Sequence, residues 1–189
     1  MGLPVHFNEL KNQIDLSVGE RKLSIHSGDL LSLTADALVC PVDPALDFRV
    51  GLAKVISVAA GKSIHKERPL VPEPYGKVVV LPGGKLNVKY IFLTVLYGEK
   101  GVEKIRMSIR QAVERAIRYA EFLRLKSIAF PVLGDPTSKP DYDFVAREMV
   151  ADAIQYFQRR NTKLKAILFS AYNANAFNAL RKEAKELAD

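Results

Sequence analysis

The chain has 189 residues, 48% hydrophobic and 26% charged, proportions that fit one water-soluble globular domain over residues 1–189. No apolar run approaches the ~18 residues of a membrane span, and the first residues lack the pattern of a secretory signal. The single cysteine, Cys40, excludes an internal disulfide and favours the cytoplasm. The formal net charge of +7 favours an anionic ligand, from a phosphorylated small molecule to nucleic acid, with no membrane partner expected.

The first predicted elements form a hairpin. Residues 13–18 and 21–26 alternate polar and apolar side chains, as half-buried strands do, and Gly19-Glu20 supplies the turn. A strand follows at residues 37–42 (ALVCPV), a continuous apolar run typical of a strand buried on both faces. Residues 50–60 have helical spacing and end before Gly61, a residue type that often stops helices.

The rest of the chain alternates strands and helices. Further strands are predicted at residues 77–81, 90–95, 127–132 and 165–169. A turn at residues 82–84 (PGG) joins the first two of these strands as a hairpin. Helices are predicted at residues 102–125, 143–159 and 175–187. The alternation predicts an α/β fold, with a mixed, mostly parallel sheet between two helical layers.

The predicted strands also locate a candidate site. Ligands of open α/β sheets bind in a crevice at the carboxyl ends of the strands. The residues from Asp43 onward, residues 131–140 and residues 169–172 follow three of these strands. The three segments are therefore expected to line one crevice, although their convergence does not identify the ligand.

Four segments, in the same order along the chain, resemble motifs of the macro domain family. Residues 23–43 carry Gly-Asp-Leu at 28–30 and Asp-Ala-Leu-Val at 36–39, and the other segments are VISVAAG (55–61), YGKVVVLPGGKLNVKYIFLTVLYG (75–98) and SIAFPVLG (127–134). The resemblance spans roughly residues 23–180. It implies a three-layer α/β/α macro-like domain, with its core at about 23–187 and the hairpin at about 13–26. It also implies a nucleotide ligand such as ADP-ribose, which some members of the family only bind and others hydrolyse.

The resemblance implies an adenine subsite. Asp29 takes the family's adenine-reading position, where a carboxylate accepts a hydrogen bond from the amino group of the base. The alternative is a capping or turn role after Gly28. Phe169 matches an aromatic residue that packs against adenine in the family, with a plain core role as its alternative, and Tyr172 is a second candidate for this platform.

The first phosphate loop departs from the family pattern. The family's Asn-Ala-Ala-Asn run is CPVD at residues 40–43, so both asparagines are replaced. Asp43 can accept a hydrogen bond from a hydroxyl but repels a diphosphate. The glycine-rich stretch is FRVG at residues 48–51, in which Phe48 and Val50 are expected to narrow the cleft. Arg49 is either a cation that binds phosphate or a surface side chain.

The second phosphate loop, GDPTSKP at residues 134–140, differs too. Pro136 has no amide hydrogen, so one donor is lost, and Thr137, Ser138 and Lys139 could compensate for it. An ordinary surface loop is the alternative. The complete set of predicted ligand-binding residues is Asp29, Leu30, Asp43, Arg49, Val50, Gly51, Leu133, Gly134, Asp135, Thr137, Ser138, Phe169 and Tyr172.

No metal or cofactor site is predicted, and no catalytic residue is assigned, although Asp43 is a weak candidate. The best-known hydrolysing relatives have an aspartate where this chain has Ala53. The histidines His6, His26 and His65 are scattered, and no phosphate-binding or dinucleotide-binding glycine motif occurs. Cys40 is interpreted as a small buried hydrophobe.

The sequence therefore predicts a module that binds ADP-ribose, or a related nucleotide or anionic ligand, without hydrolase activity. Three alternatives stay open. The first is a divergent hydrolase of another phosphorylated or ribosylated substrate, with Asp43, Asp47 or Asp135 as a base. The second is an RNA-binding module, although the sequence contains no recognisable RNA-binding motif. The third is a scaffold that has kept only a partner surface.

Overall fold

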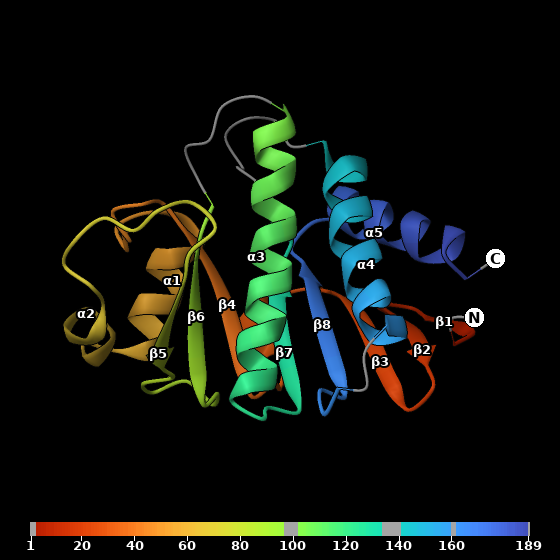
Figure 1. The fold of residues 1–189 in the computed structure, drawn as a ribbon, viewed down its shortest axis with the longest axis horizontal. Helices are drawn as coiled ribbons and strands as arrows, with labels where there is room; N and C mark the ends of the chain where they lie inside the picture. The colour runs from red at the N-terminus through yellow and green to blue at the C-terminus, as the bar shows by residue number, and fades with distance from the viewer. Residues whose placement is uncertain (1–2, 97–101, 134–140, 160–161, 189) are drawn as a thin grey trace.

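The computed structural model describes residues 3–96, 102–133, 141–159 and 162–188. Eight strands form one sheet in the order β1-β2-β3-β8-β7-β4-β6-β5 (Figure 1). The strands are β1 (Val5–Leu10), β2 (Gln13–Val18), β3 (Arg21–Ser27), β4 (Ala37–Val42), β5 (Val78–Pro82), β6 (Tyr90–Val95), β7 (Ser127–Pro131) and β8 (Ala166–Ala171). The central strands from β3 to β6 pair in parallel, and β1, β2 and β5 are antiparallel to their neighbours. The sheet is therefore mixed, as predicted.

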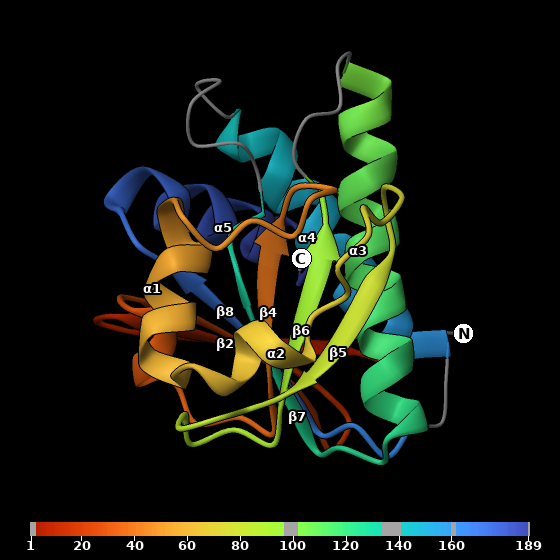
Figure 2. The ribbon, with the colours of Figure 1, turned by 90° about the vertical axis from the view of Figure 1, so that its left-hand side faces the viewer.

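Helices cover both faces of this sheet (Figures 1 and 2). One layer consists of α3 (Val102–Phe122), α4 (Tyr142–Arg159) and α5 (Ala174–Glu186), and the other of α1 (Gly51–Ala60) and the short α2 (Ser63–Glu67). Val39 and Phe92 belong to the apolar cluster under the first layer, and Cys40 and Leu93 belong to the cluster under the second. Every residue of β4 is buried because both of its faces are covered, which confirms the three-layer architecture.

Two local predictions are confirmed at glycine residues. The hairpin of β2 and β3 turns at Gly19, whose φ of +60° lies in the left-handed region that glycine adopts without strain. Helix α1 ends at Gly61, where φ is +86° and the backbone N–H donates to the carbonyl of Ser57 at 3.0 Å. Both ends are therefore set by residues that tolerate a positive φ.

One strand and one α-helix were not predicted. Strand β1 pairs with β2 at the edge of the sheet, and Val5 and Phe7 pack against the larger apolar cluster. None of its residues is fully buried, and its apolar residues alternate only at Val5 and Phe7, so the pattern is weaker than that of the equally long β2. Helix α2 has five residues, fewer than two helical turns, so its sequence has no helical period to read.

The ladder between two neighbouring inner strands, β4 and β7, is short. Among the described residues these strands pair only at Ala37–Ile128 and Leu38–Ala129. Successive residues of a strand direct their hydrogen-bonding groups to opposite neighbours. The carbonyl of Val42 accepts the N–H of Leu96, which follows β6. The preceding residue, Pro41, therefore directs its backbone groups toward β7. The N–H of Val132 donates to the carbonyl of Ser170 on the β8 side. The preceding residue, Pro131, therefore directs its backbone groups toward β4. Neither proline has an N–H, and the strands diverge toward their carboxyl ends.

None of the helices in the described ranges is long and apolar enough to cross a membrane.

Candidate functional site

The carboxyl ends of four neighbouring strands form the edge at which the candidate residues lie. In the sheet order β3-β8-β7-β4, Asp29 follows β3, Tyr172 follows β8, Leu133 follows β7 and Asp43 follows β4. From the first strand to the last this edge spans three strand spacings, at least about 14 Å because β4 and β7 diverge here. A ligand that reaches from Asp29 to Asp43 must therefore be extended.

At the β3 end of this edge, one carboxylate oxygen of Asp29 accepts a hydrogen bond. The N–H of Gly28 donates to the carbonyl of Ala171 at 2.9 Å, and the hydroxyl of Ser170 donates to the carbonyl of Gly28 at 2.7 Å. These bonds tie the end of β3 to the end of β8. Asp29 then caps a short 3-10 helix, and its Oδ1 accepts the N–H of Leu31 at 3.0 Å. Its Oδ2 has no hydrogen-bond partner in the described part of the chain, and the side chain is exposed.

The prediction that Phe169 is the aromatic platform is wrong. Phe169 is 0% exposed and packs edge-on against Phe130, with 5.8 Å between ring centroids. It shares a face of β8 with Ile167 and Ala171, and all three belong to the apolar cluster under α3, α4 and α5. The exposed aromatic residue at this strand end is Tyr172, which is 63% exposed.

Two residues that were not predicted contact Tyr172 or its partner. The hydroxyl groups of Tyr172 and Tyr142 lie 2.9 Å apart, and either can be the donor. The side-chain amide of Asn173 donates to the Tyr142 hydroxyl at 3.1 Å, while its Oδ1 accepts the N–H of Ala176 and caps α5. An asparagine before a helix is a readable capping signal. Tyr142 has no comparable signal in the sequence.

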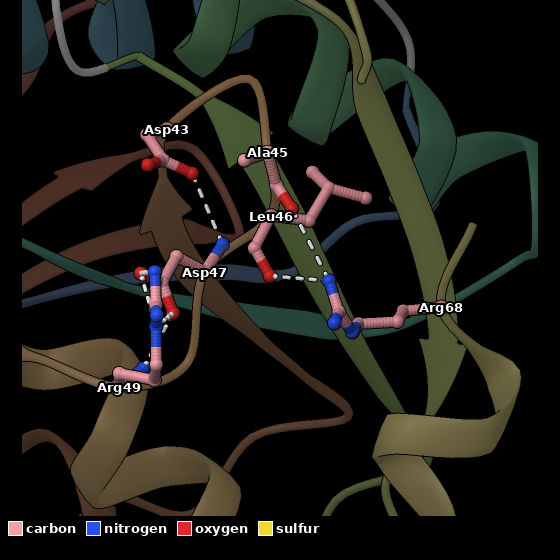
Figure 3. Close-up of polar contacts among 6 residues, drawn as sticks. All are labelled: Asp43, Ala45, Leu46, Asp47, Arg49 and Arg68. Carbon is pink, nitrogen blue, oxygen red and sulfur yellow. Dashed lines mark hydrogen bonds and ion pairs between the residues drawn. The ribbon is translucent and has the colours of Figure 1, made fainter. Parts of the chain in front are cut away.

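Side chains within and beside the loop that follows β4 bond to its backbone (Figure 3). Asp43 accepts the N–H of Asp47 through Oδ1 at 3.0 Å, and its carbonyl accepts the N–H of Leu46 at 2.9 Å. Leu46 is fully buried and has a φ of +54°, a rare conformation for a residue with a side chain. Arg68 stabilises this turn, because its Nη1 donates to the carbonyls of Ala45 and Leu46, each at 3.1 Å.

Phe48 does not narrow the cleft, contrary to the prediction. Its side chain is buried in the apolar cluster under α1 and α2, and its ring meets the edge of His65 at 5.3 Å between centroids. The guanidinium carbon of Arg68 lies 5.8 Å from the centre of the same ring. Val50 is exposed as the residue before α1 and makes no side-chain capping bond.

Arg49 extends beside the start of α1, where it is paired with Asp47. Its Nη2 lies 2.8 Å from Oδ2 of Asp47, and its Nε lies 2.9 Å from both carboxylate oxygens. The hydrogen bonds from Arg49 hold the pKa of Asp47 below its usual range, and the same contacts raise the pKa of Arg49. The Arg49 side chain is 88% exposed, so its charge is accessible to an anion although Asp47 already contacts it.

The remaining predicted residues contribute no exposed side chain that the structure describes. Leu30 and Leu133 are buried in the apolar clusters, so only their backbone could meet a ligand. Gly134, Asp135, Thr137 and Ser138 lie outside the described residues. Cys40 is fully buried, and desolvation strongly raises the pKa of its thiol, which makes it a poor nucleophile. The described residues contain no cluster of His, Cys, Asp or Glu that could hold a metal ion.

Sequence comparison relates the chain to one family. The profile of the Macro domain family matches residues 39–149. An uncharacterised protein of Sulfurisphaera tokodaii is 32% identical, over 82% of this chain and 87% of that protein. An uncharacterised protein of Pyrobaculum aerophilum is also 32% identical, over 87% of this chain and 91% of that protein. The human protein mono-ADP-ribosyltransferase PARP14 is 23% identical over 89% of this chain, which corresponds to 9% of that protein.

Structural comparison leads to the same fold. The macrodomain of Oceanobacillus iheyensis with ADP superposes with a TM-score of 0.84 and 18% identity, over 96% of this chain and 97% of that chain. A mutant of that macrodomain with ADPR gives a TM-score of 0.82 and 18% identity, over 93% of this chain and 98% of that chain. The Trypanosoma brucei macrodomain in complex with ADP gives 0.74 and 16% identity, over 86% of this chain and 68% of that chain.

Proposed function

Because this chain belongs to the Macro domain family, we propose that it binds ADP-ribose, or a related adenine nucleotide, in the crevice at the carboxyl ends of β3, β8, β7 and β4. Structural neighbours that were solved with ADP or ADPR support this choice of ligand. The observation that carries the proposal is the arrangement at the β3 end of the crevice. There Asp29, whose Oδ2 has no partner among the described residues, and the exposed Tyr172 follow neighbouring strands.

The adenine base is the part of the ligand that this end suits. A carboxylate only accepts hydrogen bonds, so Asp29 selects a base edge that carries an amino group. One carboxylate oxygen already accepts the N–H of Leu31, and this bond orients the other. Stacking on the face of Tyr172 would add about 1–3 kcal/mol, as base stacking on aromatic residues does elsewhere.

The diphosphate is assigned to the start of α1. The first bond inside this helix runs from the N–H of Lys54 to the carbonyl of Val50, so the N–H groups of residues 51–53 have no partner within the helix. Such groups attract phosphate, and the guanidinium of Arg49 adds a positive charge beside them. Gly51 leaves open space, because an added Cβ would meet no atom within 4 Å. This support offsets part of the repulsion expected from Asp43.

We propose that this crevice binds the ligand without hydrolysing it. Ala53 provides no carboxylate at the start of α1. Of the candidate bases in the described residues, Asp43 accepts the N–H of Asp47 through Oδ1, and Asp47 is paired with Arg49. Incubation with mono-ADP-ribosylated peptide and with ADP-ribose-1''-phosphate, followed by chromatography of the products, is expected to show no release of ADP-ribose or phosphate. Turnover that disappears in Asp43→Asn would instead establish the hydrolase alternative.

Isothermal titration calorimetry with ADP-ribose at low salt tests the binding proposal directly. We expect saturable binding with a dissociation constant in the micromolar range and a matching rise in the unfolding temperature. Free ligand at 100 times Kd should stabilise the fold by about 2.7 kcal/mol. Absence of both the heat and the thermal shift would refute ADP-ribose as the ligand. Steep salt-dependent binding of RNA under the same conditions would favour the nucleic-acid alternative.

A further inference from the structure

The side chain of Tyr172 is fixed at both of its ends. Its backbone follows β8, where Ala171 pairs with Ser27 of β3 and accepts the N–H of Gly28 at 2.9 Å. Its hydroxyl lies 2.9 Å from the hydroxyl of Tyr142 on α4. An exposed tyrosine with a free hydroxyl exchanges between rotamers within nanoseconds. Tyr172 is 63% exposed, yet its hydroxyl is hydrogen-bonded to Tyr142 of α4.

The partner hydroxyl is itself held in place. Tyr142 is the first residue of α4 and packs, partly buried, against the larger apolar cluster. The amide of Asn173 donates to its hydroxyl at 3.1 Å, and the carbonyl oxygen of the same amide caps α5 through the N–H of Ala176 at 2.8 Å. The two hydroxyls and this amide therefore join the starts of α4 and α5 to the end of β8. The hydrogen bond with Tyr142 is also the main cause that raises the pKa of Tyr172.

We propose that Tyr142 and Asn173 are positioning residues that fix the Tyr172 ring, before any ligand arrives, as a rigid platform for the base of the nucleotide. This proposal rests on the proposed function, since it assigns the base to Tyr172. Immobilising a flexible side chain during binding lowers affinity. In this protein the rotamer is already selected by the fold, so a ligand with a flat base gains the full stacking interaction. A ligand without a base gains nothing from the arrangement.

Tyr142→Phe is the variant that isolates the effect, because it removes one hydroxyl and keeps the ring in the core. Its dissociation constant for ADP-ribose should be about three- to tenfold higher than that of the wild type, the range expected for immobilising one side chain on binding. Its affinity for ribose 5-phosphate, which has no base, should not change. Tyr119→Phe is the matched control, because it removes an exposed phenol hydroxyl of α3 that has no hydrogen bond among the described residues.

A double-mutant cycle separates positioning from a general effect on the fold. In the Tyr172→Ala background, Tyr142→Phe should not weaken ADP-ribose binding further, because the ring that it positions is gone. Asn173→Ser offers a second test. Serine still caps α5 but is too short to reach Tyr142, so a loss similar to that of Tyr142→Phe is expected.

A ligand-free readout makes the proposal independent of the binding assay. With tyrosines labelled with ¹³C at Cζ, NMR titration at alkaline pH follows the ionisation of Tyr172, whose signal is identified by its absence in Tyr172→Phe. Tyr142→Phe should lower the pKa of Tyr172, because the hydrogen bond that raises it is lost. An unchanged titration would mean that the two hydroxyls are not bonded in solution, and it would overturn the proposal.

The outcomes also separate this inference from the proposed function. Wild-type protein that fails to bind ADP-ribose overturns the function and, with it, the assignment of the base to Tyr172. Wild-type protein that binds, together with Tyr142→Phe that binds equally well, overturns the positioning role alone. Equal losses from Tyr142→Phe in the wild-type and Tyr172→Ala backgrounds also overturn it, because the effect would not pass through Tyr172.

Discussion

Both carboxylate oxygens of Asp47 contact the guanidinium of Arg49, with Nη2 of Arg49 2.8 Å from Oδ2. The pair lies beside the first N–H groups of α1, where we place the diphosphate. A phosphate that engages Arg49 must therefore displace Asp47, or share the cation with it. Asp47 therefore competes with the phosphate of the ligand for the guanidinium of Arg49.

Asp47→Asn should strengthen ADP-ribose binding about two- to fivefold, the range expected from removing one exposed ion pair. Asparagine can still accept the N–H of Arg49, so the turn should be retained. Calorimetry at two salt concentrations checks the result, and the gain should shrink at high salt. Glu20→Gln is the matched control, because it removes the same charge from the exposed pair with Lys165 at 2.9 Å. An equal gain in both variants would mean that net charge, not the pair, is responsible.

Asp29→Asn should separate the two roles of this residue. The asparagine oxygen can accept the N–H of Leu31 and preserve the cap, so the unfolding temperature should stay within about 1 °C of the wild type. The amide NH₂ would then face the amino group of adenine, donor against donor. ADP-ribose affinity should fall at least about tenfold, as for the loss of a hydrogen bond to a charged group. Unchanged affinity would assign Asp29 to the cap alone.

Arg68→Met should loosen the turn after β4. The variant loses two hydrogen bonds to the carbonyls of Ala45 and Leu46 and the contact with the Phe48 ring. The free energy of unfolding should fall by about 1–2 kcal/mol, and ADP-ribose should bind more weakly because Asp43 and Arg49 lose a fixed position. Urea denaturation and calorimetry measure the two effects. Arg118→Met, which removes an exposed arginine of α3, should change neither.

Phe169→Ala and Tyr172→Ala should have opposite consequences. Phe169 is fully buried, so its truncation should cost about 3–5 kcal/mol of unfolding free energy. Tyr172 is largely exposed, and its truncation should leave the fold within about 1 kcal/mol of the wild type while weakening ADP-ribose binding. Denaturation and calorimetry on the same samples check both variants. A stable Phe169→Ala variant that loses ligand binding would restore the original assignment of the platform.

Asp152 on α4 should make stability depend on pH. Burial raises its pKa to about 6, because Arg110 at 3.6 Å does not outweigh desolvation and the nearby carboxylate of Glu148. The folded protein thus holds this proton more tightly than the unfolded chain, and the associated stability is lost as the pH rises through about 6. Asp152→Asn should be more stable than the wild type by about 1 kcal/mol at pH 7.5, and equally stable near pH 4. A constant difference in urea denaturation at both pH values would contradict this.

Most of the fold could be predicted because its elements are marked by local chemistry. The apolar run at residues 37–42 coincides with β4, and Gly61 stops α1 where predicted. Helix α2 has only five residues, and β1 alternates apolar residues only at Val5 and Phe7, so both depend on tertiary contacts more than on their own periodicity. Tertiary packing can stabilise segments whose local sequence is uninformative.

The candidate site was harder to predict, since its residues depend on which face of an element they occupy. Phe169 and Tyr172 lie three residues apart, and only the packing against Phe130 shows which of them is buried. The sequence allowed Asp29 to be either a helix cap or a ligand for adenine. The structure confirms the cap through Oδ1. The second carboxylate oxygen leaves the adenine role possible. Arg68 contacts a turn 22 residues away in sequence, a relationship that no local pattern contains.

Pro41 of β4 and Pro131 of β7 lie beyond the last pair that the described residues of the two strands form, Leu38–Ala129, and limit how far their ladder can extend. Two strands close into a ladder only when each can donate a hydrogen to the other, and at Pro41 and Pro131 the covalent structure removes both donors. The carboxyl ends of β4 and β7 therefore cannot form these ladder hydrogen bonds when no ligand is bound. Ligand entry breaks no ladder bond at these positions, and ligand departure cannot form one. The end of this ladder is thus set by the covalent structure of two residues.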